Sequence, residues 1–157
     1  MTELRRPKHI VCAVRGGPES RETVTRAVTL ALEHGARLTF FHVMDAEFLE
    51  YATIGPLSVV HRELEEMGKF TMLILCDRAR RRGVQQVDYE VREGNIRRQL
   101  LGFARETEAD LMVMGCPRRS PGRNVFRPEE FPAFVTQMEE EGGFRVVTVP
   151  ALAEGEA

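Results

Sequence analysis

The residues best placed to do chemistry in this chain follow one short apolar run. The segment 111–114 is continuously apolar and ends in Gly115, after which comes a loop rich in arginine. Residues 116–127 hold four cations and no acidic residue: Arg118, Arg119, Arg123 and Arg127. Backbone N–H groups at such a strand end, together with guanidinium groups, bind phosphates and other anions. The sequence therefore predicts an anion site at this strand end.

Three further residues complete the candidate crevice. Arg15 follows the first apolar run, Val43 lies near the end of the second, and Gly122 lies within the arginine loop. Because the carboxyl ends of parallel strands meet at one edge of a sheet, we expect these residues to face one crevice. The alternative is a solvated loop whose arginines pair with Glu129, Glu130 and their neighbours.

Cys116 is a candidate redox thiol, because it comes directly after the apolar run and near arginines that can activate a thiol. An inert thiol is the alternative. The three cysteines form no C-x-x-C, the four histidines have no ligand spacing, and the Walker A, G-x-G-x-x-G and G-x-S-x-G patterns do not occur. We therefore expect neither a metal site nor a catalytic constellation.

The composition predicts one domain over residues 1–157, with a core at about 8–150 and tails at 1–7 and 151–157. The formal charge of −2 gives no reason to expect nucleic acid as a partner. The chain has no run of about 20 apolar residues and no apolar leader, so we expect a cytoplasmic protein with no membrane partner.

Positioning the crevice requires alternating strands and helices. Short β-branched or aromatic segments predict strands at 9–14, 37–44, 87–92, 111–114 and 144–149. Segments of helical periodicity predict helices at 18–34, 58–82 and 95–109, and a last one that begins near Pro128 or Pro132 and closes at Gly142. For the helix at 58–82, the expected inward residues are Leu64, Met67, Thr71, Ile74 and Ala79.

The third strand alternates apolar and charged residues, as Val87, Asp88 and Tyr89 illustrate, so it belongs at a sheet edge. The first and fourth strands are apolar throughout and belong at the centre. Helices between nearly all strands require a parallel sheet with right-handed crossovers. The predicted fold class is a single three-layer α/β/α domain of the flavodoxin or Rossmann-like type.

The ordered set of segments resembles the universal stress protein family. The resemblance covers about residues 8–150 and rests on His-Ile-Val-Cys-Ala-Val-Arg-Gly-Gly-Pro-Glu-Ser, Leu-Thr-Phe-Phe-His-Val, Val-Arg-Glu-Gly-Asn-Ile and Ala-Asp-Leu-Met-Val-Met-Gly. It implies the strand order 3-2-1-4-5, which agrees with an edge position for the third strand. It also implies a homodimer joined through the fifth strand, from Phe144 to Val149.

The resemblance also locates a nucleotide motif from which this chain departs. Members that bind ATP carry a glycine after the fourth strand, a second glycine three residues later, and, ten residues after that, a glycine followed by serine or threonine. Gly115 matches the first position, whereas Arg118, Pro128 and Glu129 occupy the others, and Arg15 replaces the usual aspartate. The bulk of Arg118, the missing N–H donor of Pro128 and the carboxylate of Glu129 all disfavour the binding of a triphosphate.

Three hypotheses about function follow. The first is a non-catalytic stress-response or regulatory protein that acts with an unidentified protein partner, needs no cofactor and does not bind ATP in the family's usual way. The second is an ATP- or AMP-binding protein, with Mg²⁺, in which Gly122 shifts the loop register and the arginines bind phosphate. The third is a hydrolase of this fold group, although this chain has no identifiable nucleophile or general base.

Overall fold

The computed structural model describes residues 6–14, 20–45, 57–116 and 130–150. Its strands are β1 (His9–Ala13), β2 (Arg37–Asp45), β3 (Val87–Gly94), β4 (Leu111–Gly115) and β5 (Arg145–Val149). Its helices are α1 (Ser20–His34), α3 (Leu57–Arg82), α4 (Ile96–Glu106) and α5 (Phe131–Gly142). Each of these elements was predicted from the sequence, and most ends agree within one or two residues.

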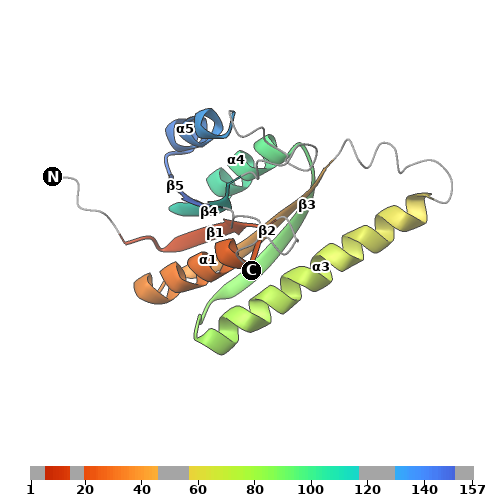
Figure 1. Ribbon diagram of the computed structural model, residues 1–157, viewed down its shortest axis with the longest axis horizontal. Helices are drawn as coiled ribbons and strands as arrows, with labels where there is room; N and C mark the ends of the chain where they lie inside the picture. Colours follow the sequence, from red (N-terminus) through yellow and green to blue (C-terminus); the bar gives the residue numbers. More distant parts are fainter. Residues whose placement is uncertain (1–5, 15–19, 46–56, 117–129, 151–157) are drawn as a thin grey trace.

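The strands form one parallel sheet in the order β3-β2-β1-β4-β5 (Figure 1). This order confirms the predicted fold class and the edge position of β3. The two central strands, β1 and β4, are buried along almost their whole length. Strands that are covered on both faces must be apolar on both faces, which explains their uninterrupted hydrophobic runs.

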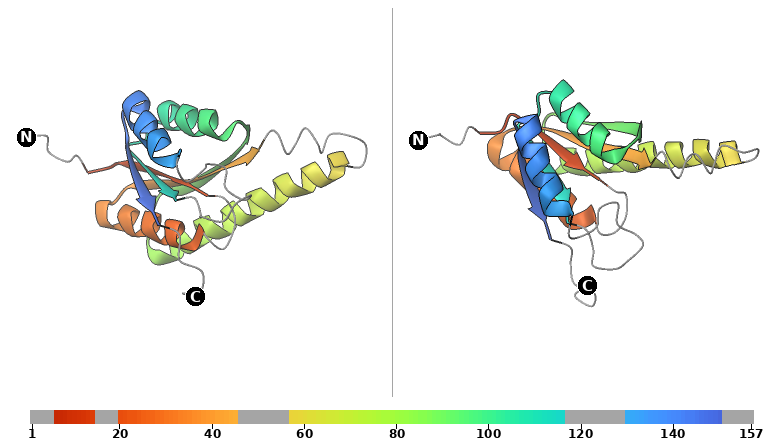
Figure 2. Two further views of the ribbon diagram at one scale, coloured as in Figure 1. Left: turned by 45° about the horizontal axis from the view of Figure 1, so that its top comes forward. Right: turned by 90° about the horizontal axis from the view of Figure 1, so that it is seen from above.

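Helices cover both faces of the sheet, with α1 and α3 on one side and α4 and α5 on the other (Figure 2). Successive strand residues therefore enter different cores, because side chains alternate along a strand. In β1, Ile10 and Cys12 join the core beneath α1 and α3, whereas Val11 joins the core beneath α4 and α5. The three-layer arrangement follows directly from this alternation.

The structure shows which of the two candidate prolines lies at the start of α5. The helix begins at Phe131, after Glu130, and Pro132 lies in its first turn. Proline is tolerated there because the N–H groups of the first turn have no partner within the helix. Pro128 lies outside the described residues.

The expected inward face of α3 was partly wrong. Ala79 is buried as predicted, but Met67 and Ile74 are exposed, and the buried side chains are instead Met72, Leu75 and Cys76. Both sets have helical spacing, so periodicity could not choose between them. The side chain of Leu64 lies outside the described residues. Over the described parts of the chain, the structure contains no helix that is both long and apolar enough to cross a membrane.

Candidate functional site

The sequence predicts the crevice beyond the carboxyl ends of β1 and β4, and the structure pairs these two strands side by side. After β1 the chain goes to β2 on one side, and β4 lies on the other, so the strand order reverses at this point. Such a switch point is where open α/β sheets bind ligands. Two backbone bonds hold the strand ends in register: Val14 N–H donates to the Phe41 carbonyl, and Cys116 N–H donates to the Val149 carbonyl, both at 2.8 Å.

Three of the predicted crevice residues lie within the described residues. Val43 lies two residues before the end of β2, Gly115 is the last residue of β4, Cys116 follows it, and all three are half-buried. Val43 and Cys116 pack against the core beneath α4 and α5. The remaining predicted residues lie outside the described residues: Arg15, Arg118, Arg119, Gly122, Arg123 and Arg127.

Gly115 has a local structural role in addition to the predicted one. A Cβ atom at this position would come within 2.8 Å of the Thr23 side-chain oxygen on α1, closer than carbon and oxygen normally approach. Thr23 is itself buried. Helix α1 therefore packs so closely on the end of β4 that only glycine fits at position 115 without movement.

His42 is a polar group at this end of the sheet, and the histidine spacing in the sequence indicated no role for it. Its Nδ1 donates to the Val14 carbonyl at 2.8 Å, and its ring packs against Gly68 of α3. In the neutral ring this bond leaves Nε2 as an acceptor. Its position inside the strand predicted at 37–44 was the available signal, because strand alternation places it on the opposite face from Val43.

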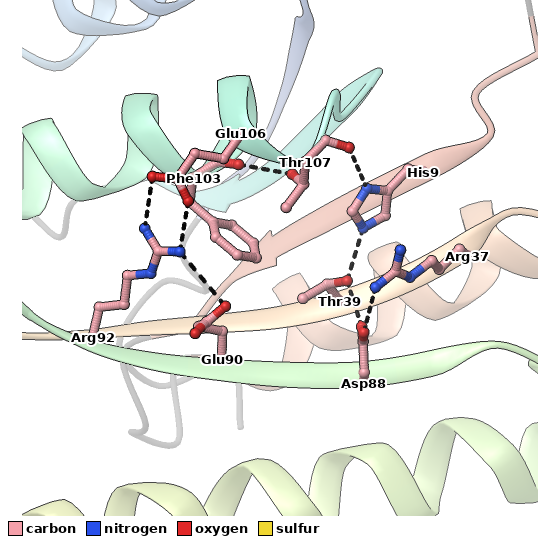
Figure 3. A network of polar contacts seen from close by, with 9 residues as sticks. All are labelled: His9, Arg37, Thr39, Asp88, Glu90, Arg92, Phe103, Glu106 and Thr107. Carbon is pink, nitrogen blue, oxygen red and sulfur yellow. Dashed lines mark hydrogen bonds and ion pairs between the residues drawn. The ribbon is translucent and has the colours of Figure 1, made fainter.

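A second polar group lies at the opposite, amino end of the sheet and was not predicted (Figure 3). His9 Nε2 lies 2.8 Å from the Thr39 hydroxyl, which donates to Asp88 at 2.5 Å, and Arg37 forms an ion pair with the same carboxylate. His9 Nδ1 faces the Thr107 carbonyl at 3.4 Å. The network joins β1, β2 and β3 where the strands begin.

Burial lowers the pKa of His9, and the hydrogen bond to the Thr107 carbonyl opposes that shift. Arg37 lowers the pKa further, whereas Asp88 and Asp110 raise it. The network lies at the far end of the strands from the switch point. We interpret the His9 network as a set of contacts that fixes the three strands to one another, rather than as part of the crevice.

A third group joins the edge strand β3 to α4 (Figure 3). Arg92 binds both carboxylate oxygens of Glu106, at 2.7 and 3.3 Å, and its guanidinium lies 4.9 Å from the centre of the Phe103 ring. Phe103 stacks on Phe41 of β2, with ring centres 4.3 Å apart. The hydrogen bonds to Glu106 raise the pKa of Arg92, and Arg92 lowers the pKa of Glu106.

The cysteines differ in environment. Cys12 and Cys76 are buried, and burial raises the pKa of both thiols, which makes them poor nucleophiles. Cys116 is half-buried, so it remains the candidate redox thiol. Within the described segments, no three histidine, cysteine or acidic side chains are grouped so as to hold a metal ion.

The chain is similar to known proteins over most of its length. Residues 7–128 match the model of the universal stress protein family. The chain is 31% identical to the sensor protein KdpD of Mycobacterium tuberculosis (strain CDC 1551 / Oshkosh) over 148 residues. The matched residues make up 93% of this chain. It spans only 15% of the length of that relative.

Two solved structures illustrate the similarity in fold. The universal stress protein UspA from Lactobacillus plantarum superposes with a TM-score of 0.71 at 21% identity, covering 90% of this chain and 97% of that one. The universal stress protein from Archaeoglobus fulgidus in complex with dAMP gives 0.58 at 14% identity, covering 90% and 96%. The strand order, the switch point between β1 and β4 and the family match agree: this chain belongs to the universal stress protein family.

Proposed function

We propose that this protein is a non-catalytic, regulatory universal stress protein that does not hold ATP in the family's usual manner. The observation that carries the proposal is the replacement of three motif positions by Arg118, Pro128 and Glu129. An arginine blocks close approach of a phosphate to the backbone, proline has no N–H to donate, and a carboxylate repels a triphosphate. The usual aspartate after β1 is Arg15.

The surviving motif glycine does not weaken this proposal. Gly115 is required by the close packing of Thr23 against the end of β4. Packing against Thr23 therefore explains the glycine at position 115 without a bound phosphate. A regulatory role is supported by the similarity to the sensor protein KdpD, although the chain spans a small part of that protein. We place the protein in the cytoplasm with an unidentified protein partner.

A second candidate function is nucleotide binding through the arginine-rich loop. The observation in its favour is that the A. fulgidus protein was solved in complex with dAMP, which has a single phosphate. Arginine side chains can bind one phosphate without the backbone cradle that a triphosphate requires. AMP is therefore the favoured ligand under this alternative, and ATP with Mg²⁺ is the other possibility to test.

Calorimetric titration tests both candidates. We expect no heat with ATP and Mg²⁺, and native mass spectrometry is expected to find no nucleotide on the purified protein. Saturable binding of AMP would support the second candidate, and tight binding of ATP would overturn the first. The variant Arg118→Gly with Glu129→Ser restores two motif positions, and we expect it to bind ATP at least tenfold more tightly.

The control variant shifts both substitutions by one residue, to Arg119→Gly with Glu130→Ser. Like the motif variant, it removes one arginine and one glutamate and leaves the net charge unchanged, but it does not restore the motif. Equal gains in the two variants would show that the loss of these side chains from the loop region, rather than the motif, controls binding. Unchanged ATP affinity in the variant Arg118→Gly with Glu129→Ser would contradict the alignment of positions 118 and 129 with the motif.

The proposal includes a homodimer formed through β5, which is an edge strand with half-exposed valines at positions 146, 147 and 149. Arg145 N–H and the Val149 carbonyl bond toward β4, so the backbone of Val146 and Thr148 points outward. Val146 N–H is bound by the Glu139 carboxylate at 3.1 Å. Thr148 therefore offers the outward N–H that a second strand can use.

The variant Thr148→Pro tests this interface, because proline removes an outward donor and leaves the bonds to β4 in place. We expect analytical ultracentrifugation to show loss of the β5 dimer. The variant Glu139→Ala frees the Val146 N–H for a partner strand and is expected to tighten the dimer. An unchanged association constant in both variants would exclude pairing through β5.

A further inference from the structure

The edge strand β3 has an outer row of backbone groups that faces away from the sheet. Leu38 of β2 donates its N–H to the Gln86 carbonyl at 2.9 Å, and β2 and β3 pair in parallel along the whole of β3. In a parallel ladder, successive residues of a strand bond alternately toward its two sides. The even-numbered residues of β3 therefore bond to β2. The odd-numbered residues, from Val87 to Glu93, direct their N–H and C=O groups outward.

Side chains from both helix layers cap the two ends of this outer row. Arg80 of α3 donates to the Val87 carbonyl at 3.2 Å, and Gln99 of α4 donates to the Glu93 carbonyl at 3.4 Å. Both contacts agree with the outward direction of the odd-numbered residues. Charged and polar side chains placed along an edge strand hinder its pairing with other strands. The two ends of β3 are therefore protected.

The two residues between the caps, Tyr89 and Val91, form the open part of the edge. Within the residues that the structure describes, their outward N–H and C=O groups form no hydrogen bond. Two such residues, separated by one that faces β2, can pair with an extended segment of three residues. A longer strand would meet the side chains of Arg80 and Gln99. The edge is therefore suited to a short extended segment.

One face of the open edge is apolar. Tyr89 and Val91 pack against the core beneath α1 and α3. A hollow of about 520 Å³ is lined by Tyr89 and by Phe70 and Leu73 of α3, among others. Residues directly opposite each other on paired strands have their side chains on the same face. The two outer residues of a bound segment, opposite Tyr89 and Val91, therefore lie on the side of this hollow and should be apolar.

The other face of β3 carries charged residues (Figure 3). Asp88 is paired with Arg37, and Arg92 is paired with Glu106 at 2.7 Å. Glu90 lies between them on the strand, its side chain is 43% exposed, and its carboxylate has a longer contact with Arg92 at 3.7 Å. The middle residue of a bound segment lies opposite Glu90, and opposite charges attract at such positions. This residue should therefore be lysine or arginine.

We propose that the middle of the β3 edge binds a short extended segment of a partner protein, with a basic residue between two apolar residues. The inference rests on the proposed regulatory function and gives the chemistry of the partner, which that function leaves unidentified. A second copy of β3 fits less well, because antiparallel pairing of Tyr89 with Val91 of the other copy places Glu90 opposite Glu90. The site lies at the opposite edge of the sheet from β5.

Amide chemical shifts of the wild-type chain provide the test. The probe is the peptide acetyl-Gly-Ser-Val-Lys-Val-Ser-Gly-amide, and the matched control carries glutamate in place of lysine. We expect the probe to cause saturable shifts of the Tyr89 and Val91 amides, because both N–H groups become hydrogen-bonded. The control should bind about fivefold more weakly, because it places like charges opposite each other. Equal affinity for the two peptides, the absence of saturable shifts, or shifts confined to β5 would overturn the proposal.

Variants of the edge test the individual contacts. Val91→Pro removes one outward N–H and leaves the bonds to β2 in place, so we expect it to bind the probe about fivefold more weakly. Val91→Ala keeps this N–H and should bind more tightly than Val91→Pro. Glu90→Lys should prefer the control peptide. Far-ultraviolet circular dichroism checks that each variant is folded. Unchanged affinity in Val91→Pro, or an unchanged preference in Glu90→Lys, would contradict the proposed pairing.

Further measurements separate this site from a contact between copies and from the proposed function. In the Thr148→Pro variant without peptide, shifts of Tyr89 and Val91 that depend on protein concentration would show that a second copy occupies the edge, contrary to the proposal. Tight binding of ATP would overturn the proposed function and leave the peptide titration unchanged. The two failures are therefore distinguishable.

Discussion

At the scale of single residues, Gly115 shows how a motif residue can be required by packing. We predict that Gly115→Ala destabilises the fold by about 1–3 kcal/mol, because the added methyl group overlaps the Thr23 side chain. Urea unfolding measures the change in free energy. In the Thr23→Ala background the obstructing oxygen is gone, so the same substitution should cost less. An equal cost in both backgrounds would contradict the packing argument.

His9 makes the stability of the fold depend on pH. Burial lowers its pKa below the ordinary 6.5, so the unfolded chain binds the proton more readily than the folded one. Stability should therefore be full above about pH 6.5 and fall as the pH drops toward the lowered pKa. Urea unfolding at several pH values measures this loss. His9→Gln should lose less stability over the same interval, and parallel curves for the two proteins would argue against the prediction.

At the scale of elements, Arg92 holds the edge strand β3 to α4. The guanidinium binds Glu106 through two hydrogen bonds and lies over the Phe103 ring. We predict that Arg92→Met costs about 0.5–1.5 kcal/mol, since the aliphatic stem is retained and the charged contacts are lost. A double-mutant cycle with Glu106→Gln isolates the ion pair, and its coupling energy should decrease with added salt. Zero coupling would assign the effect to the aromatic contact together with the longer ion pair between Arg92 and Glu90.

At the scale of the whole molecule, the sheet ends in the edge strand β5, and an exposed edge strand needs covering. We predict that Thr148→Pro is monomeric at every concentration tested by light scattering, because the outward N–H of β5 is lost while the bonds to β4 remain. Residual dimer in this variant would reveal an interface other than β5.

The sequence by itself placed β3 at an edge and β1 and β4 at the centre, because the alternation in β3 and the apolar runs of β1 and β4 depend only on how many faces of each strand are covered. The full strand order was implied by the resemblance to the family. The sequence also located the switch point and the departures at Arg118, Pro128 and Glu129. It could not choose the buried face of α3, where two stripes have the same period. Only the tertiary structure decided that Met72 and Cys76 face the sheet while Phe70 does not.

The contacts between distant segments could not be predicted from the sequence either. Thr23 against Gly115, Glu139 on the β5 edge and Asp88 between Arg37 and Thr39 all join residues that local patterns treat separately. Local periodicity reports which side of an element is apolar, since that depends on neighbours in sequence. Which partner meets that side depends on how the layers pack, and this is fixed only when the whole chain folds.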